Sequence, residues 1–438
     1  MVRVCLHARR ASPLGRRRHP DTVRRRPMTD GDTPALLRAP QHGIELVDSP
    51  RAWNRALADL GAGEGPLAVD AERASGFRYS PRAYLVQVYR RGTTNYLVDP
   101  IAVGDLSEFS TAFGDTEWIL HAAKQDLPSL REVGMSPQTL FDTELGARLA
   151  GLARVGLQGA VEDLLGVQLA KEHSAADWST RPLPAEWLNY AALDVEVLPD
   201  LRDAIAAVLA EANKTRIAEE EFEAVLREEP PAQKPEPWRR LSGLHQVRGQ
   251  RNLAIARELW EARDDLARQT DTAPGRLIPD RSIVYAAKVA PASKKALIGL
   301  KDFQGRASRK EAERWWAAIE RGTSTDNLPA LRGPRDTIPP PRAWPDRAPE
   351  AARRLAIARD LLARQSERLE IPAENVLTPD HLRRLCWNPT DPSRPSAIDA
   401  QLEELGARRW QRDIAVPLLV EAFSQAASID QAEASALA

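Results

Sequence analysis

The stretch Leu67-Ala68-Val69-Asp70-Ala71-Glu72 decides how the first half of the chain is interpreted. It is a short apolar run that ends in two acidic residues. Side chains two positions apart in a β-strand point to the same face, so Asp70 and Glu72 project together. Two such close carboxylates repel each other unless a cation lies between them. Taken alone, the pair is explained more simply as a solvated strand end.

A second acidic residue follows another apolar strand. Residues 119–127 read Ile-Leu-His-Ala-Ala-Lys-Gln-Asp-Leu, which predicts a strand that runs into a helix from about Lys124. Asp126 falls in the first turn of that helix, where the helix dipole alone favours an acid. His121 is explained more simply as a packed or hydrogen-bonded histidine than as a metal ligand.

The third segment is a helix that carries a tyrosine and an acid. Residues 187–195 read Trp-Leu-Asn-Tyr-Ala-Ala-Leu-Asp-Val, and Tyr190 and Asp194 are four positions apart, on one helix face. An ordinary helix with a half-buried tyrosine would show the same pattern. In the functional interpretation Asp194 binds a metal, and the Tyr190 hydroxyl orients the water that this metal holds.

Together the three segments supply four carboxylates, the hard oxygen ligands that magnesium prefers. Two metals close together can act on both the attacking and the leaving oxygen of a phosphodiester. The combination therefore predicts metal-assisted hydrolysis of nucleic acid. The candidate catalytic residues are Asp70, Glu72, Asp126, Tyr190 and Asp194.

In order and spacing, these segments resemble the ribonuclease D branch of the exonucleases named for four acidic residues and a tyrosine. The family shows an Asp-x-Glu strand, a His-Ala-x-x-x-Asp helix start and a Tyr-x-x-x-Asp helix, which this chain matches at residues 70–72, 121–126 and 190–194. The run Asp-Trp-Ser-Thr-Arg-Pro-Leu at 177–183 and the strand Tyr-Leu-Val-Gln-Val at 84–88 also match. The resemblance covers about residues 43–212.

The chain departs from the family directly after the first motif. Arg73 stands where an aromatic or apolar residue is common, and the loop 74–81 contains Gly76 and Tyr79 in place of the usual residues. We expect these differences to affect the fit of the substrate more than catalysis.

The resemblance implies an α/β fold of the ribonuclease H-like type, with a mixed five-stranded sheet flanked by helices. It implies two divalent cations, Mg²⁺ or Mn²⁺. Asp70, Glu72 and Asp194 would hold the first, and Asp70 would bridge to the second, which Asp126 completes. Tyr190 would orient the attacking hydroxide. The products would be nucleoside 5′-monophosphates, released from the 3′ end of RNAs such as tRNA precursors.

Length and composition agree with an enzyme of several domains. The 438 residues allow two to four domains, and 43% apolar residues are enough for their cores. No run reaches the 18 or so apolar residues of a membrane span. The two cysteines, Cys5 and Cys386, are too few for a disulfide framework, so we expect a cytoplasmic protein. We also expect a monomer without a membrane partner.

The N-terminal segment is strongly basic. Residues 1–27 contain nine arginines and one acid, Asp21. We expect residues 1–42 to lack regular structure. The arm could bind RNA, or translation could begin at Met28 instead.

Proline-rich stretches divide the rest of the chain. We expect an exonuclease domain over 43–225, a linker over 226–237, a helical module over 238–320, a second linker over 321–349, another helical module over 350–427 and a tail over 428–438. Asn-Leu-Ala-Ile-Ala-Arg-Glu-Leu-Trp at 252–260 is echoed by Arg-Leu-Ala-Ile-Ala-Arg-Asp-Leu-Leu at 354–362. The echo indicates a divergent duplication of one small helical module.

Residues 235–312 resemble the helicase-and-RNase-D C-terminal (HRDC) module. Residues 235–297 contain twelve Lys and Arg against seven Asp and Glu. Such a basic helical module is typical of a surface that binds the phosphate backbone, although any single side chain could equally be a solvated one. The candidate nucleic-acid-binding residues are His121, Arg239, Arg240, Arg248, Arg251, Lys294 and Lys295. The second module is HRDC-like but matches less well.

Three alternatives stand beside the exoribonuclease. A DNA 3′–5′ exonuclease would use the same metals, and the two differ in contacts to the 2′-hydroxyl, which one sequence does not show. A nucleic-acid-binding protein that has lost activity is disfavoured by the intact carboxylates and tyrosine. A helicase is excluded because the chain has no Gly-x-x-x-x-Gly-Lys-Ser/Thr loop.

Overall fold

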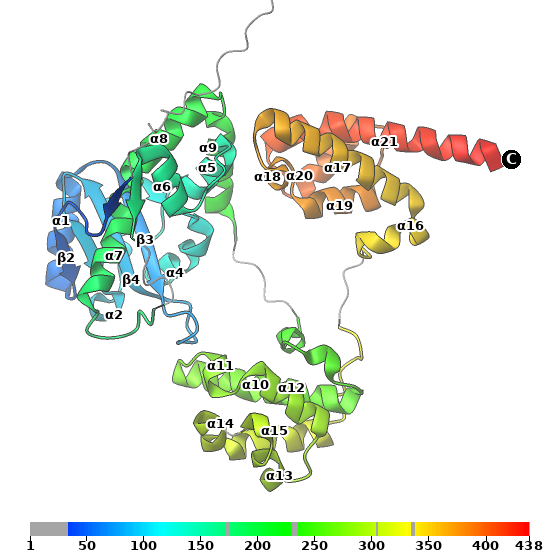
Figure 1. Cartoon of the computed structure of the whole chain (residues 1–438), viewed down its shortest axis with the longest axis horizontal. Helices are drawn as coiled ribbons and strands as arrows, with labels where there is room; N and C mark the ends of the chain where they lie inside the picture. Colours follow the sequence, from blue (N-terminus) through cyan, green and yellow to red (C-terminus); the bar gives the residue numbers. More distant parts are fainter. Residues whose placement is uncertain (1–33, 171–175, 230–234, 304, 334–337, 438) are drawn as a thin grey trace, which may run out of the picture. The chain divides into compact units, whose positions relative to one another are not determined.

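The computed structural model describes residues 34–170, 176–229, 235–303, 305–333 and 338–437 (Figure 1). The basic segment 1–27 lies outside these residues. Strand β1 (Ala35–Leu37) lies inside the segment 1–42 for which we expected no regular structure. It pairs in parallel with β8 (Val167–Leu169), a partner too distant in sequence for the local pattern to reveal.

The main sheet is mixed, as expected, but it has six strands instead of five. Their order is β2-β5-β4-β3-β6-β7, with β3 antiparallel to β4 and parallel to β6. The strands are β2 (Ile44–Val47), β3 (Glu64–Arg73), β4 (Ala83–Arg91), β5 (Asn95–Val98), β6 (Glu117–Leu120) and β7 (Thr139–Asp142). β7 is a four-residue strand at the edge of the sheet, and its alternation is too short to stand out in the sequence.

Helices cover both faces of this sheet. Leu67, Val69 and Ala71 of β3 pack in the core on one face, with side chains of the helices there. These helices are α1 (Pro50–Ala62), α3 (Ser107–Ala112) and α4 (Leu127–Glu132). Because side chains alternate along a strand, Asp70 and Glu72 belong to the opposite face.

That opposite face is covered by helices from the second half of the domain. α7 lies against β3, β4 and β5, and α8 against β3 and β6. The helices are α5 (Thr143–Ala150), α6 (Leu157–Leu165), α7 (Ala185–Glu196), α8 (Leu198–Glu211) and α9 (Thr215–Arg227). Along the chain, α7, α8 and α9 follow one another with two short breaks. A one-turn helix, α2 (Pro100–Val103), follows β5.

The HRDC region is helical. It contains the 3₁₀ turns η2 (Pro237–Arg240), η3 (Leu244–Gln246) and η4 (Lys301–Phe303), and the helices α10 (Gln250–Thr270), α11 (Pro274–Leu277), α12 (Asp280–Val289), α13 (Lys294–Ile298), α14 (Arg306–Lys310) and α15 (Ala312–Ser324). Buried Trp238, Leu259, Ile283 and Trp315 form its core.

The C-terminal region is helical as well. It contains η5 (Pro341–Ala343), α16 (Trp344–Arg347), α17 (Pro349–Leu369), α18 (Ala373–Val376), α19 (Pro379–Trp387), α20 (Pro395–Glu404) and α21 (Arg409–Leu437). Of these, η5 and α16 fall inside the expected second linker. In the described residues, no helix is long and apolar enough to cross a membrane.

The geometry supports the duplication inferred from sequence. Helices α10 and α17 are both 21 residues long, and each ends at a residue in the left-handed conformation, Asp271 (φ 45°) and Glu370 (φ 50°). A four-residue helix follows in each case, then two residues, of which the first (Ile278 or Leu377) is extended, and then α12 or α19. The turn after the long helix, which we call the corner, therefore occurs twice in the chain.

Candidate active site

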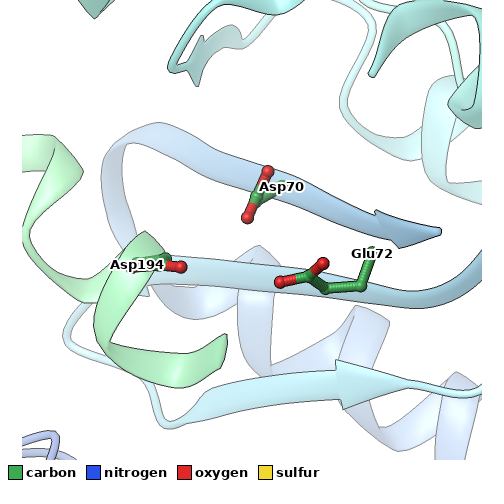
Figure 2. Close-up of side chains that lie close together, drawn as sticks. All are labelled: Asp70, Glu72 and Asp194. Carbon is green, nitrogen blue, oxygen red and sulfur yellow. The ribbon is translucent and has the colours of Figure 1, made fainter. Parts of the chain in front are cut away.

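Strand β3 and helix α7 bring three carboxyl groups together. Carboxylate oxygens of Asp70, Glu72 and Asp194 lie within 4.8 Å of one another. Figure 2 shows them turned toward a common space, with Asp194 supplied by the helix. Residues 124 positions apart in sequence thus meet at one point.

Asp126 reaches the same cleft by a different local structure from the one expected. Instead of one helix from Lys124, the chain forms a 3₁₀ turn, η1 (Ala123–Gln125), before α4 begins at Leu127. Asp126 precedes α4, but its side chain makes no capping hydrogen bond. The carboxylate is therefore not used by the helix terminus, which was the simpler structural explanation for it.

An unpredicted residue, Asp142, shapes the turn that presents Asp126. Its carboxylate accepts hydrogen bonds from the backbone N–H groups of Ala122 (3.0 Å) and Ala123 (2.9 Å). It also accepts from Glu144 and Leu145 and so caps α5. Ala122 has φ 62°, a conformation that a small side chain tolerates better than a β-branched one. An acid directly before a helix is a known capping signal, which gives the one sequence clue to this role.

The loop before α7 is fixed by Arg181, which belongs to the Asp-Trp-Ser-Thr-Arg-Pro-Leu run at 177–183. Its guanidinium makes a bidentate ion pair with Asp99 (2.6 and 2.8 Å) and donates to the carbonyl oxygens of Trp178 and Tyr84. Trp178 is fully buried, and its ring lies 6.5 Å from the Tyr190 ring. These contacts set the position of the helix that carries Tyr190 and Asp194.

The carboxylates are crowded and poorly solvated. Burial, followed by the charges of Asp70, Asp194 and Asp126, raises the pKa of Glu72 to about 10. Burial, followed by the charge of Asp70, raises the pKa of Asp126 to about 8 and that of Asp194 well above its usual range. Such a cluster favours either protons or a bound cation.

The tyrosine is held as a neutral phenol. Burial and the neighbouring charge of Asp194 raise the pKa of Tyr190, and the two side chains share a hydrogen bond. The phenol can therefore orient a water molecule by hydrogen bonding, without acting as a strong base.

All five candidate catalytic residues line one cleft of about 620 Å³, together with His121 and Arg73. The His121 Nδ1 lies 2.9 Å from the Thr143 hydroxyl, and burial lowers the pKa of the imidazole to about 4. His121 is thus a neutral, hydrogen-bonded side chain at neutral pH. Arg73, singled out as a departure from the family, lies with its Nη2 4.0 Å from Asp126 Oδ1.

The six basic HRDC candidates fall into two groups. Arg239 is paired with Glu236 and donates to the Ala330 carbonyl, Arg251 donates to the Thr325 carbonyl, and Lys294 pairs with Glu313. Arg240, Arg248 and Lys295 are exposed, and their side chains make no ion pair or hydrogen bond within the described part of the chain. The sequence could not distinguish these groups, because the partners lie on other segments.

Comparisons with known proteins place each region of the chain in a family. A family described as "3'-5' exonuclease" matches residues 44–210, the HRDC domain family matches residues 252–319, and a family described as "3' to 5' exonuclease C-terminal domain" matches residues 337–423. The chain is 31% identical to ribonuclease D of Jannaschia sp. over 283 residues, covering 62% of this chain and 72% of that protein. It is 29% identical to ribonuclease D of Pseudomonas paraeruginosa, covering 82% and 92% respectively.

Solved structures show the same fold. A protein from Bifidobacterium adolescentis is 38% identical with a TM-score of 0.83, covering 90% of this chain and all of that one. Escherichia coli RNase D, titled an exoribonuclease involved in structured RNA processing, is 24% identical with a TM-score of 0.62, covering 87% and 99%.

The ribonuclease H-like sheet and its carboxylate cleft define a nuclease of the 3′–5′ exonuclease class, a hydrolase of phosphodiester bonds. Within that class, the chain belongs to the ribonuclease D family, whose members are 3′–5′ exoribonucleases.

Proposed function

We propose that this protein removes nucleotides one at a time from the 3′ ends of structured RNAs, tRNA precursors among them. We further propose that Asp70, Glu72, Asp126, Tyr190 and Asp194 perform the chemistry. The observation that carries the proposal is the convergence of all five in one cleft, with three carboxylates within 4.8 Å. The RNA substrate is supported by the ribonuclease D relatives.

The donor set fits two divalent cations, Mg²⁺ or Mn²⁺. Asp70, Glu72 and Asp194 would hold one, and Asp126, whose side chain caps no helix, would hold the other together with Asp70. When bound, the cations would activate the attacking water and stabilise the leaving 3′-oxygen. The raised pKa values of the carboxyl groups are the physical reason to expect a counter-charge here.

The protein's own residues would then orient the reactants. The Tyr190 hydroxyl, kept protonated by its raised pKa, would hold the attacking water by a hydrogen bond beside Asp194. Asp142 would act indirectly, because its hydrogen bonds fix the turn from which Asp126 reaches the cleft.

The HRDC region offers a basic cleft for the RNA backbone. His245, Arg248 and Arg332 line a cleft of about 790 Å³ with Arg239. Arg248 and Arg332 are exposed and have no hydrogen bond or ion pair among the described residues. Guanidinium groups in this state are suited to phosphate contacts, which would weaken as salt rises.

The test compares RNA with DNA, and free 3′ ends with blocked 3′ ends. RNA and DNA of one sequence, labelled at the 5′ end, are incubated with Mg²⁺, each with a free or a blocked 3′ end. We expect a stepwise ladder on RNA with a free 3′ end, with nucleoside 5′-monophosphates as products. Equal cleavage of DNA would replace the RNA assignment by a general 3′ exonuclease, and cleavage of blocked RNA would refute the direction. The monomeric state and the cytoplasmic location stay predictions.

A further inference from the structure

The loop that follows strand β3 begins at the catalytic cleft and contacts the HRDC region. Strand β3 ends at Arg73, after an irregularity in its pairing between Glu72 and Arg73. Arg73 and Ser75 line the catalytic cleft. The following residues, 76–82, do not line it. Four of them, Gly76, Phe77, Tyr79 and Ser80, contact the HRDC region instead.

Asp271 makes the central contact. This residue ends α10 in the left-handed conformation. One carboxylate oxygen accepts the backbone N–H of Ser80 (2.9 Å), and the other accepts the hydroxyl of Tyr84 (2.9 Å). One side chain of the HRDC region therefore holds the loop and the strand that follows it.

Neighbouring residues hold the other end of the loop. Arg276 in α11 donates to the Gly76 carbonyl (2.8 Å), and its guanidinium lies 4.1 Å from the centre of the Phe77 ring. The backbone N–H of Ala273 donates to the Phe77 carbonyl (3.0 Å). The Tyr79 hydroxyl donates to Asp264. Contacts at Gly76, Phe77, Tyr79 and Ser80 thus connect this loop to α10, to α11 and to the corner between them.

The duplicated corner makes a comparable contact elsewhere. Glu370 ends α17 as Asp271 ends α10, and its carbonyl lies 3.4 Å from Lys214 Nζ of the exonuclease domain. Gly151, with φ +84°, approaches so closely that an added Cβ would lie 2.8 Å from the same carbonyl. Both copies of the module therefore use the corner after their long helix to contact the exonuclease domain.

We propose that the α10–α11 corner acts as a clamp that positions Arg73 to contact a phosphate of the RNA backbone next to the scissile bond. Arg73 is the contact residue, and Asp271 is a positioning residue that acts through the loop. The proposal rests on the RNA substrate of the proposed function. It gives the HRDC region a second role, in shaping the catalytic cleft.

The chemistry of Arg73 supports this role. Its guanidinium lies at the cleft, 33% exposed, and its nearest carboxylate is 4.0 Å away, too far for a good hydrogen bond. A planar guanidinium matches a phosphate through two parallel hydrogen bonds. The adjacent carboxylates repel the phosphates of an approaching RNA backbone. The positive charge of Arg73 at this edge reduces that repulsion.

The experiment is a double-mutant cycle on RNA affinity. Affinity for a short RNA with a free 3′ end is measured by fluorescence anisotropy in EDTA, so that no cleavage is required. The variants are Asp271→Gly, Arg73→Ala and the double variant. Glycine suits the left-handed backbone at position 271 while removing both acceptor oxygens. Glu370→Gly is the matched control, since it removes a carboxylate at the equivalent corner and keeps the carbonyl that faces Lys214.

We expect each single variant to weaken RNA affinity about tenfold, the scale of one charge-assisted hydrogen bond. Asp271→Gly should add less than twofold in the Arg73→Ala background. Amide hydrogen exchange over residues 76–82 should become faster in Asp271→Gly and stay unchanged in Glu370→Gly. Asp271→Asn keeps one acceptor oxygen and tolerates the same backbone conformation. Its exchange rate over this loop should lie between those of wild type and Asp271→Gly.

The proposal would be overturned if the double variant lost RNA affinity by the product of the two single losses. Unchanged amide exchange over residues 76–82 in Asp271→Gly would overturn it as well. In Asp271→Gly and Glu370→Gly, which substitute neither the four carboxylates nor Arg73, the Mn²⁺ affinity measured by calorimetry should equal that of wild type. An inactive wild-type enzyme would refute the proposed function, whereas the affinity cycle would still decide whether the clamp acts through Arg73.

Discussion

Replacing Glu72 with glutamine should stabilise the metal-free protein and abolish its response to metal. The pKa of Glu72 is raised from 4.5 to about 10 in the folded state by burial and by the neighbouring carboxylates. The folded protein therefore keeps a proton that the unfolded chain loses above about pH 4.5. The resulting stability is fully present below that pH and is lost progressively as pH rises toward 10.

Each pH unit between these limits costs about 1.4 kcal/mol, so the loss at pH 8 is at most about 5 kcal/mol. The neighbours titrate together with Glu72 and share the penalty, so we expect about 2 kcal/mol of it to belong to this residue. Glutamine cannot ionise and escapes the penalty. The variant should therefore unfold at higher urea than wild type in EDTA at pH 8, with a difference close to zero at pH 5.

Magnesium should reverse the order of stability. Wild type binds the cation only in the folded state and gains stability in proportion to the logarithm of its concentration, whereas Glu72→Gln lacks one ligand and gains little. Glu186→Gln, an exposed carboxylate on α7 outside the cleft, is the control and should behave as wild type. If Glu72→Gln were no more stable than wild type in EDTA at pH 8, the account of a repulsive carboxylate cluster would be wrong.

Three further variants test other parts of the structure. Asp142→Ala should lower the free energy of unfolding by about 3 kcal/mol, because it leaves four backbone N–H groups without their acceptor; a urea midpoint equal to wild type would contradict this. Tyr190→Phe should lower kcat about a hundredfold and leave Mn²⁺ affinity unchanged, since the hydroxyl orients water and holds no metal; loss of Mn²⁺ binding would assign the phenol a different role. Arg408→Ala should destabilise the protein by about 3 kcal/mol, because Glu221, 1% exposed, loses its ion-pair partner, whereas the adjacent and exposed Arg409→Ala should change stability by less than about 0.5 kcal/mol.

The sequence was sufficient for those parts of the site that depend on local pattern. The alternation along residues 67–72 placed Asp70 and Glu72 on one face, and the four-residue spacing placed Tyr190 and Asp194 on another element facing the same cleft. Bringing the segments together required the family resemblance, because no local rule states that β3 and α7 meet.

What the sequence did not show depends on contacts between distant segments. Strands β1, β7 and β8 are three or four residues long and are stabilised by partners that local propensity does not reveal. Asp142 stood in the sequence as an ordinary capping residue, and its hold on the Ala122–Ala123 turn exists only in the folded structure. For the same reason, charge alone could not separate the engaged Arg239 from the exposed Arg248.

The most direct test of the central claim, a metal-dependent active site built on Asp194, is one gel. A 5′-labelled RNA is incubated with wild type and with Asp194→Asn, each in Mg²⁺ and in EDTA, and sampled over time. We predict a ladder that shortens from the 3′ end only in the lane with wild type and Mg²⁺, while Asp194→Asn keeps the thermal stability of a folded protein. Equal shortening by Asp194→Asn, or by wild type in EDTA, would contradict the account.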